Sequence, residues 1–415
     1  HCPAMSTSPL RAWLGAAGRG LGVAAALAAC AAPPQSAGPR GEPARAPSRA
    51  APPARDDGRW AAEVRSPRPV EPAVEPDLAR RCGAPDAALA AVAQRLADEH
   101  ARGAVDLETP RVAFELRAAG SPYPWPRVFT LTGAALDARA ATEPLERWLA
   151  SFDDGGERRC GLGRATDARG ATHRVAVVAD VLADLAPLPV RTRTGAWLRL
   201  EAELLVPAAG AKVLLLGPRG RPRPVPTSLS DGRARATFAL AEPGPWLVQL
   251  LADTQSGPRP VSEAIVHADV PPPGEYVAVE VPGEAAARGA ATPARALAAM
   301  IDAARASEGL GRLALDPELG ALAAAHAETM RAARRLGHDV GDGDLVARLA
   351  AADVTPRVAG ENVAHAADVT RGHRVIWQSP SHRETLLDPR FDAVGVGLAP
   401  DPDGSTWLCE ILAQR

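Results

Sequence analysis

Apolar and polar residues follow several different rhythms along the chain, and these rhythms divide it into segments. Residues 77–186 combine helical spacing, as in "PDAALAAVAQRLADEHARG" and "ATEPLERWLASF", with strand-like runs such as "RVAFELRAA" and "RVFTLTG". They end in "CGLGRATDARGATHRVAVVADV", two apolar runs around a turn that contains glycine. This order predicts an α+β domain.

Residues 187–273 show only the rhythm of strands. Runs such as "TGAWLRLEAELLVPA", "AKVLLLGPRG" and "SEAIVHADV" are short and regularly spaced, with Gly and Pro between them. Short strands without helices predict a small β-sandwich, immunoglobulin-like in size. The segment "VPPPGEY" closes it, and we place a stiff linker at residues 274–291.

Residues 292–415 return to a helical rhythm. Thr292 and Asp316 each precede a proline at the first helical position, which predicts two capped amphipathic helices. A third helix would end at Trp377, and "FDAVGVGLAPDPDGSTWLCEILAQ" predicts a hairpin that turns at "DPDG". The expected result is a set of helices packed on an antiparallel sheet.

Several motifs of this last segment resemble one known superfamily. "DPEL", "AHAETM", "GHD", "GEN", "W-x-S-P-x-HR" and "DPRF-x-x-x-GVG" follow one another as in the cysteine-rich secretory proteins, antigen 5 and pathogenesis-related proteins, called CAP or SCP-like domains. The resemblance covers residues 292–415 only. It implies an α-β-α sandwich whose cleft carries two histidines and one or two glutamates.

Transferred motif by motif, the resemblance assigns His338, Glu361 and His382 to the cleft. Two imidazoles and a carboxylate are a suitable set for zinc or another divalent cation, with Glu361 orienting a bound water. Alternatively, the three side chains hydrogen-bond to one another and tie loops together. Pro380 is expected to break the helix so that His382 turns inward. The residues expected to support the cleft are Asn362, Trp377 and Arg383.

The second cleft glutamate of the family has no counterpart here. It would fall at Ser379 or Pro380, and Glu384 is the nearest carboxylate that could replace it. Ser379 or Ser381 beside His382 would suggest a hydrolase, but a serine next in sequence to its base rarely has attack geometry. The catalytic residues are therefore left unassigned. On the helix that begins after Asp316, His326 shares the apolar face and is expected to be a packed core residue.

The N-terminal residues predict export. After Met5 come two arginines and the apolar run "LGVAAALAA", which is too short to cross a bilayer and predicts a signal peptide in residues 1–30. "LAAC" resembles the bacterial lipobox, which implies a lipid on Cys30. Because Ala31 rather than Asp follows, the resemblance implies an outer-membrane lipoprotein. Cleavage of an ordinary signal peptide near Ala32 is the alternative.

Composition adds three limits. Residues 31–76 are rich in Pro, Ala, Arg and Ser without apolar periodicity, which predicts a disordered tether. The formal net charge of -2 argues against a nucleic-acid partner. In an oxidising compartment Cys82 and Cys160 can form a disulfide, which would leave Cys409 as a buried strand thiol.

Two functional classes fit these observations. The first is a non-catalytic binding module on a lipid tether, whose cleft holds an envelope or extracellular ligand such as a lipid, a glycan or a peptide. The second is a metal-assisted hydrolase of the cell envelope. The missing glutamate favours the first class. Aromatic residues make up only 4% of the chain, which argues against an extended carbohydrate platform.

The two helical regions also resemble each other. Each runs from a tryptophan on a helix, Trp148 or Trp377, to a G-x-G strand, a charged turn and a second apolar strand. We therefore predict that residues 77–186 are a degenerate copy of the CAP fold without "GEN" or "SPSHR", and so without a cleft site. The alternative is that any helix followed by a hairpin would look this similar.

Overall fold

The computed structural model describes residues 59–68, 70–104, 107, 109–134, 137–151, 155–255 and 257–415. The predicted signal peptide, Cys30 and most of the predicted tether lie outside these residues. Within the described part of the chain, no helix is long and apolar enough to span a membrane.

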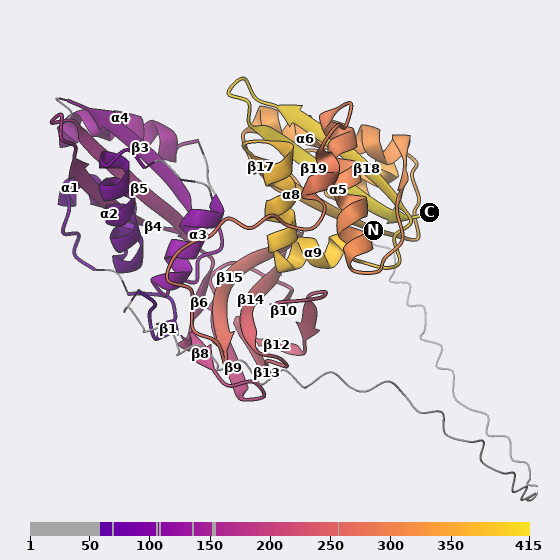
Figure 1. The fold of residues 1–415 in the computed structure, drawn as a ribbon, viewed down its shortest axis with the longest axis horizontal. Coiled ribbons are helices and arrows are strands. Elements are labelled where there is room, and N and C mark those ends of the chain that lie inside the picture. Colours follow the sequence, from indigo (N-terminus) through magenta and orange to yellow (C-terminus); the bar gives the residue numbers. More distant parts are fainter. Residues whose placement is uncertain are drawn as a thin grey trace, which may run out of the picture. The chain divides into compact units, whose positions relative to one another are not determined.

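The first described domain is a four-stranded sheet with helices on both faces (Figure 1). The sheet order is β2-β4-β5-β3, with β2 parallel to β4 and the other pairs antiparallel. Apolar residues of α2 and α3 pack on one face, and those of α1 and α4 pack on the other. The elements are α1 (Pro76–Cys82), β2 (Ala84–Pro85), α2 (Ala87–Ala101), α3 (Thr109–Ala118), β3 (Arg127–Gly133), α4 (Ala138–Leu149), β4 (Glu157–Thr166) and β5 (Thr172–Val181).

One predicted strand of this domain is wrong, because "RVAFELRAA" lies in helix α3. Val112 and Leu116, four residues apart, are both buried, while Arg111 pairs with Glu115 along the same helix. A spacing of four places residues on one helical face, and this outweighs the local alternation of apolar and polar residues. The disulfide between Cys82 and Cys160 joins α1 to β4.

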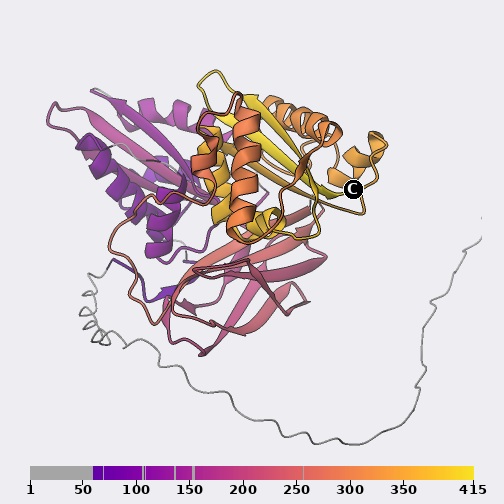
Figure 2. The ribbon, with the colours of Figure 1, turned by 45° about the vertical axis from the view of Figure 1, so that its right-hand side comes forward.

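The second domain consists of two sheets that share one apolar core (Figure 2). The sheet orders are β11-β10-β14-β15-β8 and β12-β13-β9-β6, and only β8 pairs in parallel. The strands are β6 (Ala183–Leu185), β8 (Arg191–Thr192), β9 (Trp197–Leu204), β10 (Gly210–Leu216), β11 (Arg223–Val225), β12 (Thr227–Ser230), β13 (Arg233–Ala239), β14 (Gly244–Thr254) and β15 (Gly257–Ala268). A ribbon formed by β1 (Glu63–Val64) and β7 (Leu188–Pro189) adds Val64 and Leu188 to this core.

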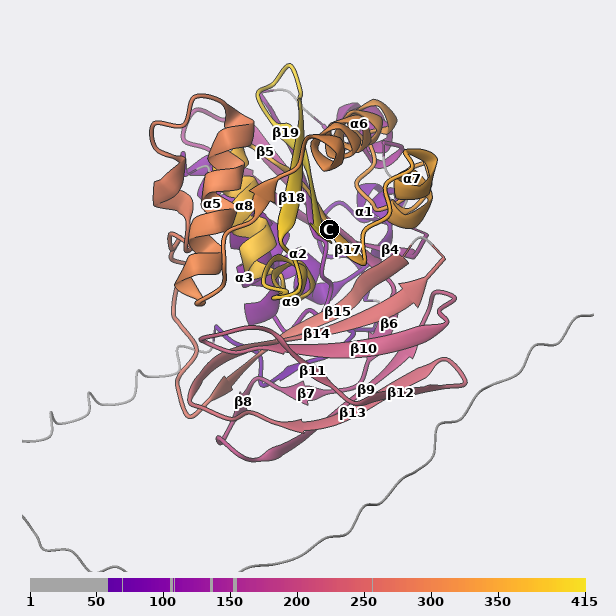
Figure 3. The same cartoon turned by 90° about the vertical axis from the view of Figure 1, so that its right-hand side faces the viewer.

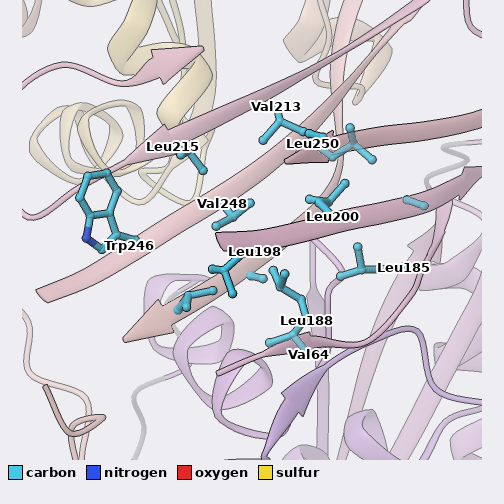
Figure 4. Close-up of a cluster of buried hydrophobic side chains, with 14 of the residues drawn as sticks. Val64, Leu185, Leu188, Leu198, Leu200, Val213, Leu215, Trp246, Val248 and Leu250 are labelled. Atoms are coloured by element: carbon cyan, nitrogen blue, oxygen red, sulfur yellow. The ribbon is translucent and has the colours of Figure 1, made fainter. Parts of the chain in front are cut away.

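Buried and exposed side chains alternate along these strands, which explains how the strands form two layers. In β9, Leu198, Leu200 and Ala202 are buried, whereas Trp197 is 76% exposed. The buried side chains of β9 meet those of β14 and β10, including Val248 and Leu215 (Figure 4). Each strand therefore gives one face to the core and one to its surroundings, as the period of two requires.

The third domain again has a four-stranded sheet between helices. The sheet order is β16-β18-β19-β17, with β16 parallel to β18. Helices α5 and α8 cover one face, and α6 covers the other together with α7 (Figure 3). The elements are η1 (Glu284–Ala287), α5 (Pro293–Ser307), β16 (Ala314–Leu315), α6 (Pro317–Ala333), α7 (Leu345–Ala351), β17 (Val358–Ala366), α8 (Val369–Gln378), α9 (Pro380–Leu386), β18 (Ala393–Pro400) and β19 (Thr406–Gln414).

For this domain, the predicted helix caps are confirmed, the predicted helix end at Trp377 is confirmed to within one residue, and the expected effect of Pro380 is modified. Thr292 and Asp316 cap α5 and α6 through their side chains, with a proline at the start of each helix. The helix that carries Trp377 ends one residue later, at Gln378. Pro380 does not lead into an irregular turn, because it begins the new helix α9, in which its missing N–H costs nothing.

Candidate functional site

The three predicted cleft residues come from different elements that meet at the edge strand β17. His338 lies in the loop after α6, Glu361 lies in β17, and His382 lies in the first turn of α9. Glu361 pairs with Ile411 and Asn362 pairs with Glu410 along the ladder, so adjacent residues of β17 face opposite sides of the sheet. The site is therefore built around the middle of an edge strand.

Glu361 has a bonded partner on each carboxylate oxygen. His338 Nδ1 lies 2.9 Å from Oε1, and Arg348 Nη2 donates to Oε2 at 2.7 Å. The Cys409 thiol also points at Oε2, at 3.4 Å. Burial alone would raise the pKa of Glu361, but the hydrogen bond from His338 and the nearby positive charges outweigh it and lower that pKa. Glu361 is thus an ionised hub rather than a free base.

Arg348 is the main cleft residue that sequence reasoning missed. It lies in "LVARLAA", where an arginine looks like an ordinary solvated helix position. In the structure it is buried, and it also donates to the backbone carbonyls of His338 and Gly343. It therefore fixes the loop that presents His338 as well as the carboxylate that orients it.

His326, expected to be a packed core histidine, is fully buried and also bonded. Its Nδ1 lies 2.7 Å from Asp342, its Nε2 lies 3.0 Å from the Gly337 carbonyl, and Glu361 is 3.9 Å away. This side chain ties α6 to the segment on both sides of His338. The signal that could have revealed it is the Asp-rich "DVGDGD" that follows "GH".

His382 lies in an environment that keeps its imidazole neutral. The residue is 8% exposed, and its buried Nδ1 has no hydrogen-bond partner among the described residues. Burial, followed by the positive charge of His338, lowers the pKa of His382 to about 3. His382 is thus a neutral imidazole with one buried nitrogen that lacks a partner among the described residues.

Behind His382 lies a second buried polar group. Asn362 donates from Nδ2 to the His382 carbonyl at 3.2 Å and to Glu410 Oε2 at 3.1 Å. Glu410 is fully buried, and burial raises its pKa to about 7. Asn362 Oδ1 and Glu410 Oε1 are buried without partners among the described residues. Asn362 thus supports His382, while Glu410 is a carboxyl group that the sequence did not single out.

Trp377 and Arg383 support the helix that carries His382. The Arg383 guanidinium lies 3.9 Å from the centre of the Trp377 ring, and its Nε donates to the Trp377 carbonyl at 2.7 Å. Burial lowers the pKa of Arg383 to about 10. The contact holds α9 against the end of α8.

The face of α9 also contacts the β-sandwich. Gln249 of β14 accepts a hydrogen bond from the Ser381 backbone N–H at 3.0 Å, and Lys212 pairs with Glu384 at 2.6 Å. A Cβ added to Gly257 would lie 3.9 Å from that of His338. Glu384, considered as a replacement for the missing glutamate, is therefore committed to a lysine of another domain.

The remaining serines and histidines have other roles. The Ser379 and Ser381 hydroxyls lie 3.2 Å from each other. His365 stacks on Trp407, and His373 Nε2 lies 2.9 Å from the Pro282 carbonyl. His365 thus links β17 to β19, and His373 links α8 to the segment before η1.

The expected set of two imidazoles and a free carboxylate is not present, because both oxygens of Glu361 are already bonded. In the part of the chain that the structure describes, no group of three or more His, Cys, Asp or Glu is arranged to hold a metal ion. Because His338 uses Nδ1 to contact Glu361, its Nε2 is the nitrogen left for a ligand, and His382 has its unpartnered Nδ1. Glu361 would be an outer carboxylate behind His338 if these nitrogens took a ligand.

The geometry defines an α-β-α domain in which a buried glutamate of the edge strand holds a histidine of the loop after α6. The family model described as "Cysteine-rich secretory protein family", or CAP, matches residues 298–411. The chain therefore carries a CAP domain at its C-terminus. No curated protein matches the chain.

Three solved structures show the extent of the likeness. An outer surface protein from Borrelia burgdorferi is 22% identical, with 29% of this chain and 90% of that chain covered and a TM-score of 0.28. An extracellular SCP-domain protein from Bacillus anthracis is 18% identical, with 57% of this chain and 83% of that chain covered and a TM-score of 0.27. A cysteine-rich secretory protein from Staphylococcus aureus is 14% identical, with 57% of this chain and 81% of that chain covered and a TM-score of 0.26.

Proposed function

We propose that this chain is an exported, lipid-anchored binding protein of the cell envelope, and that its CAP domain binds rather than hydrolyses its ligand. The observation that carries the proposal is the state of Glu361. Both of its oxygens are already bonded, one to His338 and one to Arg348, and its side chain is 2% exposed. A general base must reach the proton that it removes, and this carboxylate faces its own supports instead.

The ligand-facing groups are then His338 and His382. We place a divalent cation such as zinc between them as the polar part of the site, with Glu361 holding the His338 ring in a fixed orientation. When bound, such an ion would supply a positive charge for a carboxylate or phosphate group of a small or lipidic ligand.

The alternative is a metal-assisted hydrolase, and turnover distinguishes the two. Zinc-loaded protein would be incubated with fluorogenic peptide and ester substrates, together with a Glu361→Gln variant. We expect no turnover above that of a metal-matched buffer for either protein. Turnover by the wild type that falls by two orders of magnitude or more in Glu361→Gln would contradict the binding proposal, because that loss is typical of a general base.

The lipid anchor belongs to the same proposal. It rests on the "LAAC" sequence at Cys30 and on the following Pro-rich segment. Two or more acyl chains give stable anchoring, since each buried methylene contributes about 0.8 kcal/mol. Replacing Cys30 by Ser should move the protein from the membrane to the soluble fraction and abolish acyl labelling. Unchanged fractionation of the variant would overturn the anchor.

We also propose that the first domain is a degenerate copy of the CAP fold. The order β2-β4-β5-β3 repeats β16-β18-β19-β17, including the parallel pair at one edge. Glycines provide a second support. A Cβ on Gly161 or Gly163 would lie within 2.1 Å of the α2 backbone, and a Cβ on Gly395 or Gly397 would lie equally close to that of α6. Two sheets thus place a helix against a G-x-G strand in the same way.

The strand registers also support loss of the site in the first domain. Gly395 pairs with Ile411, which pairs with Glu361, and Gly161 pairs with Val177, which pairs with Val128. By the same correspondence, Phe129 stands where the CAP domain has Asn362, and Ala176 and Val175 stand where it has Glu410 and Cys409. An experimental structure tests the copy. If the strands of residues 128–181 fail to superpose in order on those of the CAP domain, the proposal is wrong.

A further inference from the structure

Two histidines outside the CAP domain approach each other through one ring nitrogen each. His100 ends helix α2 and His173 begins strand β5, and their Nδ1 atoms lie 2.8 Å apart. The Thr132 hydroxyl of the neighbouring strand β3 lies 3.1 Å from the same nitrogen of His173. Two potential ligand atoms from two further elements, His100 Nδ1 and Thr132 Oγ1, therefore lie beside Nδ1 of His173.

The far side of the His173 ring fixes which nitrogen is free. Nε2 lies 3.1 Å from Asp167 Oδ2, and a carboxylate only accepts hydrogen bonds, so the Nε2 proton points to Asp167. The lone pair of a neutral His173 is then on Nδ1, toward His100 and Thr132. Asp167 is itself held, because its Oδ1 accepts from the backbone N–H groups of Arg169 and Ala171.

We propose that His100, His173 and Thr132 form a binding site for a divalent late transition-metal ion, with Asp167 orienting His173 and water completing the coordination. Two ligands at right angles, each about 2.0–2.1 Å from an ion, stand roughly 2.9 Å apart. The observed separations of 2.8 and 3.1 Å match this spacing. Copper(II), which prefers tetragonal nitrogen and oxygen coordination, should bind more tightly than zinc.

The surroundings favour a cation at this point. His100 lies in the last turn of α2, where the carbonyl end of the helix favours positive charge. The carboxylate behind His173 is the outer partner that metal-binding histidines usually have. His100 is only half-buried, which leaves a path for the ion.

The site is distinct from the CAP cleft and does not depend on the function proposed for that cleft. Its test therefore uses the full chain with His338→Ala and His382→Ala in place, which removes the cleft imidazoles. Copper(II) is titrated into this protein and into versions that also carry His100→Ala, His173→Ala or, as the matched control, His365→Ala. Electron paramagnetic resonance counts the nitrogen ligands, and thermal unfolding checks that each variant folds.

We expect two coordinated imidazole nitrogens in the parent protein. His100→Ala and His173→Ala should each leave one, and each should reduce the affinity for copper(II) at least tenfold. His365→Ala should leave the number of nitrogen ligands and the copper affinity unchanged. Asp167→Asn keeps every ligand but removes the orienting carboxylate, and we expect a loss of roughly tenfold or more. Equal affinities for the parent, His100→Ala and His173→Ala would overturn the site. Unchanged affinity in Asp167→Asn would overturn the role of that carboxylate.

Discussion

Arg348 Nη2 donates a 2.7 Å hydrogen bond to Glu361 Oε2, and the two side chains are only 6% and 2% exposed. This buried pair lies behind His338 and links α7 to the edge strand β17. It determines what the cleft can do, because it keeps the glutamate charged and occupied. In the proposed binding role, His338 and His382 are the groups that would meet a ligand, while Glu361 stays paired within the protein.

Removing the arginine should leave a buried charge without its partner. We expect Arg348→Met to reduce the free energy of unfolding by about 3–5 kcal/mol, because uncompensated buried charges are costly. Adding Glu361→Gln should recover part of this loss. Urea unfolding measures both effects, with the exposed Arg357→Met as the control. Equal destabilisation by the two arginine changes would contradict a buried ion pair.

Glu410 should make stability depend on pH in a defined direction. Its pKa rises from 4.5 to about 7 on folding, so the folded state holds a proton that the unfolded state releases between these values. Wild type should therefore lose stability relative to Glu410→Gln as pH rises through this window, by roughly 3 kcal/mol in total. Urea unfolding of both proteins at pH 4.5, 6 and 8 gives the difference. A difference that does not change with pH would mean that Glu410 ionises freely.

Glycine at position 397 is required by close packing. A Cβ there would lie 2.1 Å from the backbone of Ala323 in α6, so Gly397→Ala should cost about 3 kcal/mol or more. Gly320, within the same helix, has no described atom within 4 Å of an added Cβ. Gly320→Ala should stabilise the protein by about 0.5–1 kcal/mol through helix propensity. Thermal unfolding distinguishes the two, and destabilisation by both would argue against the packing shown.

Gln249 should hold the CAP domain on the sandwich more firmly than the nearby ion pair does. It accepts a hydrogen bond from the Ser381 N–H and donates one to Glu263, which also accepts a hydrogen bond from Arg117. Because Gln249 is fully buried, Gln249→Ala leaves unpaired polar groups, and we expect a cost of about 1–3 kcal/mol. Lys212 is 43% exposed, so Lys212→Ala should cost less than about 1 kcal/mol. Hydrogen exchange at α9 should rise only in the first variant, and a rise in both would contradict this ranking.

Local signals in the sequence predicted much of the fold. The proline-capped starts of α5 and α6, the alternating strands of the sandwich and the ordered CAP motifs all depend on residues close together in the chain. The error at α3 arose because a ten-residue helix can also read as a strand. Its identity depends on Val112 and Leu116 packing beneath α2, which is a tertiary contact.

The site was predicted in part for the same reason. His338, Glu361 and His382 stand in motifs, whereas Arg348 and Glu410 stand in a helix and a strand that carry no motif of their own. Their roles come from burial beside partners that are distant in sequence, such as Arg348 beside Glu361 and Glu410 beside Asn362. The contact of Glu384 with Lys212 likewise depends on how two domains meet, which local periodicity does not encode.

Zinc titration by calorimetry tests the central claim about the CAP cleft most directly. The wild type is compared with His338→Ala, with the double variant His338→Ala and His382→Ala, and with His365→Ala as a control outside the cleft. If the two imidazoles are the ligands, each loss should weaken zinc binding by an order of magnitude or more. His365→Ala should bind as the wild type does. Identical isotherms for wild type and the double variant would contradict a ligand-binding role for His338 and His382, and would leave these side chains a purely structural one.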